Sequence, residues 1–329
     1  MKQRSFTRLC VALALTWSVA ASAPADAWGR EGHLYINRAA ALALPADTPA
    51  FMHTPAAVRT ITYFGPEPDR WNALGGLSDT LRPEHYVLLE LADTAGPLPR
   101  TRLDYIRQLT AAQIAHPDHA AELTPYNVGL QPYSALEVHG RLVAAMREYR
   151  RLSAAHEDTK PVEVGILFYA GWLGHYVGDG ANPMHTSVNY NGWVQANPDG
   201  FTGVGYDVHR EWENIYLPAN VKAGDFTALV TPPHVLHDVF GDYMTYLRQS
   251  NALVRKTYTL QKQGGFKGTG TPEGLQFTRE RLAVGASMLR DMIYSAWVES
   301  ATPPASTSDG APVAVAGQKR GGQSDALPR

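Results

Sequence analysis

Two pairs of residues have the spacing and the chemistry of metal ligands. His175 and Asp179 are four residues apart, and so are His209 and Glu213, so that each pair lies on one face of a helix and can reach one cation. Imidazole nitrogens and carboxylate oxygens without thiolates suit zinc, with positions left open for water and substrate. Two such pairs favour a catalytic metal site over the alternative in which these residues cap helices or are hydrogen-bonded within a core.

A third histidine follows the first pair. Gly180 and Pro183 are expected to end the helix after Asp179, so that His185 enters a turn and can ligate from another direction.

Residues 1–27 are typical of a secretory signal peptide. Three basic residues precede an apolar run, from Leu9 to about Ala21, that is too short to span a membrane. Two A-x-A cleavage sites compete, Ala21–Ala23 and Ala25–Ala27, and we favour the second. The only cysteine, Cys10, lies in this segment. We therefore expect a thiol-free mature chain that starts at Trp28 and is exported to the periplasm or the medium, with no stable membrane anchor.

Cleavage before Trp28 would create a further metal site. The free α-amino group and carbonyl oxygen of Trp28 can chelate a metal in a five-membered ring, and His33, at the start of an expected helix, can complete the site. The alternative for His33 is a polar helix start.

The connection 65–84 leads to two further candidate groups. Asp69 and Arg70 form one group, and His85 and Tyr86 form the other. The alternative for each of them, taken singly, is an ordinary surface residue. Long ordered loops in compact domains are often functional, and the connection 189–207 is a second such loop that ends near a histidine.

The elements that must position these residues are helices. Apolar residues recur at helical spacing, without runs that alternate as strands do. The clearest helical segments are 100–116, 134–155, 162–178, 235–262 and 273–299. We predict one all-α domain over residues 28–300, followed by a disordered tail, 301–329, rich in Ala, Pro, Ser and Gly.

Composition and the absence of certain motifs exclude several classes of protein, among them a dedicated duplex-DNA binder. The 329 residues are 44% hydrophobic, which is enough for a large core. The 29 Lys and Arg residues against 31 Asp and Glu give no cationic field of the kind that a dedicated duplex-DNA binder carries. G-x-S-x-G, P-loop and H-E-x-x-H motifs do not occur.

Over roughly residues 28–299, the sequence resembles the zinc-dependent phospholipase C and S1/P1 nuclease superfamily. The resemblance rests on an ordered series of motifs: W-x4-H, D, H, H-x3-D-x5-H and H-x3-E. The resemblance implies a single multi-helix domain with a cleft that holds three zinc ions. It implies one zinc held by Asp69, His85, His175 and Asp179. It implies a second held by the Trp28 amino and carbonyl groups, His33 and Asp179. It implies a third held by His185, His209 and Glu213.

Three metal ions can clamp a phosphodiester and lower the pKa of bound water toward ~7, so the implied reaction is in-line displacement at phosphorus. Asp69 is the best candidate to orient or deprotonate the attacking water, Arg70 to neutralise phosphate charge, and Tyr86 to contact substrate. Leu88 stands where nucleases carry a base-binding carboxylate. The substrate stays open between a phospholipid and a single-stranded nucleic acid, with a generic phosphodiesterase that acts on both as a third option. No obligate protein partner is inferred. The alternatives are an exported protein that binds zinc without catalysis and a helical scaffold whose histidines are incidental.

Overall fold

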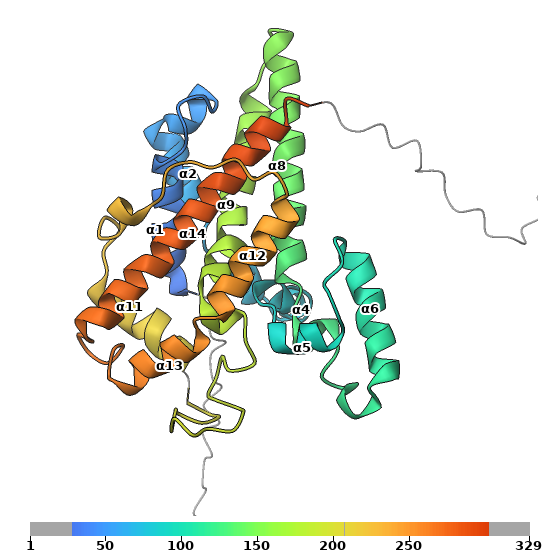
Figure 1. The fold of residues 1–329 in the computed structure, drawn as a ribbon. Coiled ribbons are helices and arrows are strands. Elements are labelled where there is room, and N and C mark those ends of the chain that lie inside the picture. The colour runs from blue at the N-terminus through green and yellow to red at the C-terminus, as the bar shows by residue number, and fades with distance from the viewer. Residues whose placement is uncertain (1–27, 207, 303–329) are drawn as a thin grey trace, which may run out of the picture.

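Helix α9 (Lys160–Ala181) runs through the middle of the molecule (Figure 1). The computed structural model describes residues 28–206 and 208–302, so the predicted signal peptide, its cleavage site and most of the predicted tail lie outside the described residues. The longer helices packed against α9 are α1 (Gly29–Leu42), α2 (Pro55–Tyr63), α8 (Gln131–Ala154), α12 (Val239–Asn251) and α14 (Pro272–Glu299). The described residues form one helical domain without strands, apart from an isolated bridge between Trp193 and Gly203. The expectation of an all-α fold is confirmed.

Small residues let the neighbouring helices approach the buried half of α9. Every residue from Leu173 to Ala181 is buried. A Cβ atom on Gly174 would lie 2.1 Å from Oδ1 of Asn37 on α1, so no larger residue fits there. The Asn37 amide donates to the carbonyl oxygens of Ile61 and Gly171, at 2.9 and 2.8 Å. These contacts fix α1, and with it His33, across the ligand-bearing end of α9.

Four of the expected helices are found with small shifts at their ends, and one is divided. The segments 100–116, 134–155, 162–178 and 273–299 correspond to α6 (Arg102–Ala115), α8, α9 and α14. The segment 235–262 is instead divided into α12 and α13 (Val254–Lys262). At the break, the side-chain amide of Asn251 donates to the Thr186 carbonyl oxygen at 2.8 Å.

The expected end of the helix after Asp179 is two residues too early, because α9 continues to Ala181. Gly180 lies inside α9, where a Cβ atom would approach Leu247 and Tyr246 to 2.8 Å, so this glycine permits packing rather than ending the helix. Asn182 follows the helix, and its side chain accepts a hydrogen bond from the amide of Met184. His185 therefore lies at the end of a short 3-10 helix, η4 (Pro183–His185).

The connection 65–84 is helical rather than a loop. It contains α3 (Glu67–Asn72), α4 (Gly75–Leu81) and the start of a 3-10 helix, η2 (Arg82–His85). Pro68 fixes a helical backbone angle in the first turn of α3, and Trp71 packs edge-on against Trp172 of α9. The second connection is irregular over residues 189–206, as expected.

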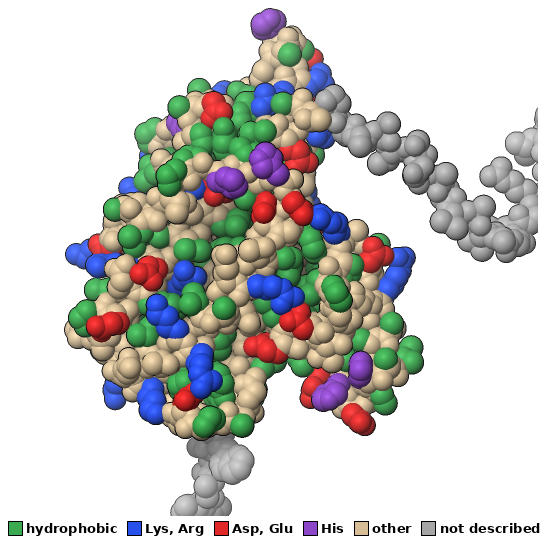
Figure 2. All heavy atoms as spheres, viewed as in Figure 1, with side chains coloured by type: hydrophobic (Ala, Val, Ile, Leu, Met, Phe, Trp, Pro, Cys, Tyr) green, Lys and Arg blue, Asp and Glu red, His purple; other side chains and the backbone are tan. Residues whose placement is uncertain are grey.

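The surface carries mixed charge. Figure 2 shows acidic and basic side chains interspersed on the face drawn, in accord with the composition. None of the described helices is long and apolar enough to cross a membrane.

Candidate metal centre

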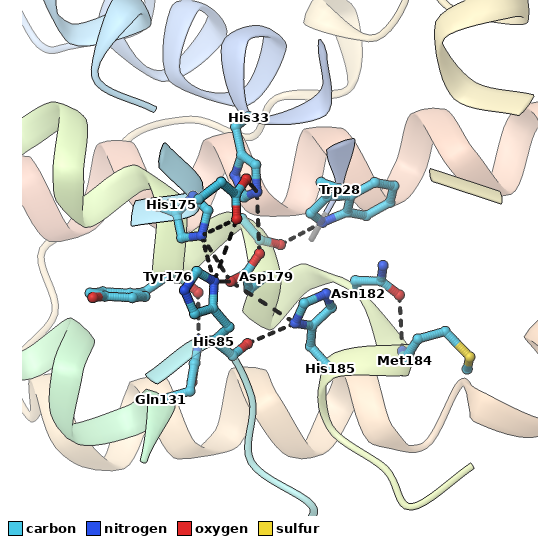
Figure 3. Close-up of polar contacts among 12 residues, drawn as sticks. Trp28, His33, His85, Gln131, His175, Tyr176, Asp179, Asn182, Met184 and His185 are labelled. Carbon is cyan, nitrogen blue, oxygen red and sulfur yellow. Dashed lines mark hydrogen bonds and ion pairs between the residues drawn. The ribbon is translucent and has the colours of Figure 1, made fainter. Parts of the chain in front are cut away.

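The histidines and acidic residues of the sequence motifs lie on several elements, and Figure 3 shows five of them gathered at the end of α9: His33, His85, His175, Asp179 and His185. The ligand-type side chains are His33 from α1, Asp69 from α3, His85 from η2, His175 and Asp179 from α9, His185 from η4, His209 from α10 (Val208–Arg210) and Glu213 from the π-helix η5 (Glu211–Tyr216). All are buried except Asp69, which is partly exposed. The described chain thus has three groups of His, Asp and Glu residues that could hold metal ions.

The first group is formed by His85, His175 and Asp179. His175 Nε2 lies 2.8 Å from His85 Nδ1 and 3.4 Å from Asp179 Oδ2. Asp179 Oδ2 is 3.5 Å from His85 Nδ1. Asp69 Oδ1 is 3.5 Å from His175 Nε2 and 3.7 Å from His85 Nδ1, which brings together all four residues implied for one zinc.

The second group is formed by His33, Asp69 and His175. The His33 and His175 rings are stacked, with their centroids 4.0 Å apart. His33 Nε2 lies 4.0 Å from Asp69 Oδ2 and 3.3 Å from Asp179 Oδ1. Since Oδ2 of the same Asp179 faces His85 and His175, this carboxylate lies between His33 and the two histidines of the first group.

The third group is formed by His185, His209 and Glu213, as the resemblance implies. His209 Nε2 lies 2.8 Å from His185 Nε2 and 2.9 Å from Glu213 Oε1. His185 Nδ1 is 4.0 Å from Asp179 Oδ2, so this group adjoins the first. Because residues 209 and 213 lie on a helical turn that continues into η5, their four-residue spacing places both side chains on one face, as expected.

Backbone carbonyl groups fix the tautomers of two histidines. His175 Nδ1 lies 2.9 Å from the carbonyl oxygen of Gly65, and His185 Nδ1 lies 2.7 Å from that of His85. A carbonyl oxygen only accepts hydrogen bonds, so Nδ1 carries the proton in both rings and Nε2 presents a lone pair to its group. Metal-binding histidines are typically oriented by such an outer hydrogen bond.

The electrostatics of the ligands suit a cation. Burial lowers the pKa of His85 to about 4, with a further contribution from Arg82, and burial also holds the pKa of His175 and His185 well below the usual value. These imidazoles are therefore neutral at pH 7, which is the form that binds metal.

Asp179 shows the opposite effect. Burial, together with the negative charges of Asp69 and Glu213, raises its pKa well above the usual value. Neither carboxylate oxygen of Asp179 accepts a hydrogen bond from any described residue, although the side chain is completely buried. An ionised carboxylate in such a place is costly unless a cation compensates it. The residues present therefore fit metal binding.

Trp28 lies beside this centre. Its completely buried indole donates from Nε1 to the carbonyl oxygen of Gly178, at 2.5 Å, and packs edge-on against Trp212. Its own carbonyl oxygen accepts a hydrogen bond from the amide of Gly32 at 3.2 Å. Its φ of 27° lies outside the α-helical region, so Trp28 precedes α1 rather than belonging to it. Whether its amino group is free depends on cleavage after residue 27, outside the described residues, so its role as a ligand stays a prediction.

A cavity of about 230 Å³ opens over the candidate metal centre. Its walls include aromatic, apolar and amide side chains, and its floor includes four of the ligand-type residues. The lining residues are Asp69, Asn72, Arg82, His85, Tyr86, Leu88, Tyr126, Asn127, Met184, His185, Tyr190 and His209. Tyr86 is among them, with its hydroxyl bonded to the Tyr126 carbonyl oxygen.

Arg70 does not line this cavity. Its guanidinium pairs with Glu67, donates to the Tyr63 carbonyl oxygen at 3.2 Å and lies over the Tyr63 ring, 4.4 Å from its centroid. Of the Lys and Arg residues that the structure describes, Arg82 is the one that lines the cavity. The sequence analysis did not identify Arg82. Its position three residues before His85 places both side chains on one face of a 3-10 helix, but the sequence did not predict a 3-10 helix there.

Comparisons of the chain with protein-family models, with curated proteins and with solved structures find no match. Function is therefore inferred from the geometry of the site and from the sequence motifs.

Proposed function

We propose that this chain is an exported, zinc-dependent phosphodiester hydrolase of the phospholipase C and S1/P1 nuclease type. The observation that carries the proposal is the arrangement of Asp179, whose two buried oxygens face different ligand groups at the floor of one open cavity. Such an arrangement supports neighbouring metal ions that act on one substrate, rather than one isolated structural ion.

Zinc is the metal that this donor set favours. Imidazoles and carboxylates without a thiolate leave room for exchangeable ligands, which distinguishes catalytic from structural zinc sites. When bound, the metal ions supply Lewis-acid stabilisation of phosphate charge and lower the pKa of water at the site. Three divalent cations would outweigh the charges of Asp69, Asp179 and Glu213, so the loaded cavity favours an anionic substrate.

The chain's own side chains position the substrate and move the proton. Asp69 is the carboxylate of the ligand set that also lines the cavity, so its Oδ atoms can orient an attacking water and accept its proton. Tyr86 lies on the cavity wall, where its ring can pack against the part of the substrate next to the phosphate. His175 and His185 are held in one tautomer and stay neutral while they bind metal.

The experiment that tests this proposal uses protein that begins at Trp28. Its metal content is measured by mass spectrometry, and hydrolysis is followed on single-stranded DNA and on phosphatidylcholine vesicles. We expect about three zinc ions, as the groups in the structure suggest, and metal-dependent release of either nucleotides or diacylglycerol. Full activity after verified metal removal would refute the proposal. Bound zinc without turnover on any phosphodiester would favour a non-catalytic zinc protein.

A matched pair of variants separates the site from the rest of the surface. His209→Gln removes a buried ligand of the third group, and His119→Gln changes an exposed histidine at the end of a distant 3-10 helix. We expect the first variant to lose about one zinc ion and at least about 100-fold in rate, because a metal that contacts the reacting phosphate is lost. The second variant is expected to keep both.

A further inference from the structure

We propose that Arg82 is the specificity residue of the cavity and binds a second anionic group that neighbours the scissile phosphodiester, as the next phosphate does in a polynucleotide. The inference rests on the proposed function. It adds a named cationic subsite, and a preference among substrates, to the metal centre.

The local backbone aims Arg82 at the metal centre. Arg82 and His85 are the first and last residues of the 3-10 helix η2, and side chains three residues apart lie on the same face of a 3-10 helix. The turn is held in place because Pro83 is buried and its carbonyl oxygen accepts a hydrogen bond from the amide of Leu130 at 2.6 Å. Arg82 therefore stands beside a proposed metal ligand, at the exposed rim of the cavity.

The neighbouring charges are already paired, whereas Arg82 is available. Glu84, two residues along, turns to the other side, where it accepts hydrogen bonds from Arg102 at 3.0 Å and from Tyr176 at 2.7 Å. Arg70 is paired with Glu67. Among the described residues, Arg82 has neither an ion pair nor a side-chain hydrogen bond, and it is the one Lys or Arg that lines the cavity.

The cavity chemistry favours a nucleotide over a choline headgroup. A guanidinium binds phosphate through several donors at once and repels a quaternary ammonium group. The remaining walls carry the amides of Asn72 and Asn127 and the rings of Tyr126 and Tyr190, which suit hydrogen bonding and stacking with a base. Asp69, a proposed metal ligand, is the one carboxylate that lines the cavity in the described part of the chain, so a choline would have only tyrosine rings to hold it, next to the like charge of Arg82.

The direct test is a binding measurement on the zinc-loaded protein. Thymidine 3′,5′-bisphosphate is compared by calorimetry with the two thymidine monophosphates, which each lack one phosphate. We expect the bisphosphate to bind about five-fold more tightly than either, with a preference that shrinks as salt is added, since Arg82 is exposed. Arg82→Gln should bring the ratio close to one, and Arg82→Lys should keep part of it.

The control variant is Arg70→Gln, which removes an arginine of the same region that does not line the cavity. It should keep the preference of the unaltered protein. Equal affinities for bisphosphate and monophosphates in the unaltered protein, or a preference that survives Arg82→Gln, would overturn the assignment.

An activity measurement chooses between the two sources of a flanking anion. We expect the zinc-loaded protein to cleave single-stranded oligonucleotides faster than phosphatidylglycerol or phosphatidylcholine. We expect Arg82→Gln to slow that cleavage by a larger factor than it slows hydrolysis of bis(p-nitrophenyl) phosphate, which carries no flanking anion. Arg82-dependent hydrolysis of phosphatidylglycerol without cleavage of oligonucleotides would overturn the assignment to polynucleotides. Failure of the proposed function itself looks different, because bis(p-nitrophenyl) phosphate would then also resist hydrolysis at full zinc content.

Discussion

The phenolic hydroxyl of Tyr176 donates a hydrogen bond to Oε2 of Glu84 across 2.7 Å. Each of these residues adjoins a proposed metal ligand in the sequence, Tyr176 after His175 and Glu84 before His85. The bond thus joins α9 to η2 directly behind two imidazoles whose nitrogens lie 2.8 Å apart. Arg102 also binds Glu84 and extends the connection to Glu137 on α8.

Removal of this bond should weaken metal binding more than it weakens the fold. In Tyr176→Phe, Glu84 keeps Arg102 as a partner, so we expect the free energy of unfolding of metal-free protein to fall by only about 1 kcal/mol. Zinc affinity should fall by about 10-fold, because the two histidines lose a restraint on their relative position. Competition with a chromogenic chelator measures the affinity, and Tyr63→Phe, in which an exposed tyrosine is changed, serves as the control.

Asp179→Asn should have opposite effects on stability with and without metal. In the metal-free protein, the pKa of Asp179 is raised, so the ionised carboxylate is unfavourable at pH 7, and the amide should leave the melting temperature unchanged or higher. With zinc present, the variant should melt several degrees below the unaltered protein, because it has lost a ligand that faces two groups. Thermal denaturation with and without chelator shows both effects. A variant that is equally destabilised in both conditions would contradict a metal role for this residue.

His139 predicts a pH dependence that is independent of the metal site. Burial lowers the pKa of His139 from 6.5 to about 4, so the unfolded chain takes up a proton at a higher pH than the folded chain does. The resulting contribution to stability is complete above about pH 6.5 and is lost as the pH falls toward 4, by up to about 3 kcal/mol.

His139→Leu tests this expectation by urea unfolding in the presence of chelator. The difference in unfolding free energy between pH 7 and pH 4.5 should be smaller in the variant than in the unaltered protein, because one titrating group is gone. His119→Gln should keep the full difference. If His139→Leu also keeps it, the acid sensitivity arises elsewhere.

A row of side chains on α14 holds the extended segment 230–237. Three side chains spaced four residues apart accept hydrogen bonds from backbone amides of this segment. The pairs are Ser287 with Thr231 at 3.1 Å, Asp291 with His234 at 2.9 Å and Ser295 with Leu236 at 2.8 Å. Asp291 also binds the completely buried guanidinium of Arg290, at 2.6 Å.

Asp291→Ala should therefore cost about 3 kcal/mol or more, because it leaves a buried cation without its carboxylate. Ser295→Ala should cost only about 1 kcal/mol, since a single hydrogen bond is lost. Chemical denaturation at one fixed metal concentration compares the two variants. Equal losses would show that the ion pair with Arg290 is not the main role of Asp291.

The sequence by itself determined the helical class and most of the ligand-type residues. Four-residue spacing places two side chains on one helix face whatever surrounds them, so the pairs 175/179 and 209/213 could be recognised from local geometry alone. Apolar periodicity likewise located α6, α8, α9 and α14 to within a few residues, because burial of one face is a property of each segment.

Only the tertiary structure decided which groups meet. The distance from His33 to Asp179 depends on the approach of α1 to α9, which Gly174 and Asn37 allow through a contact between distant parts of the chain. The helical state of residues 67–81 depends partly on packing of Trp71 against α9, which outweighs the loop signals of glycine and proline. The different roles of the two arginines also depend on the tertiary structure. The fold pairs the Arg70 guanidinium with Glu67 and places Arg82 in the lining of the cavity.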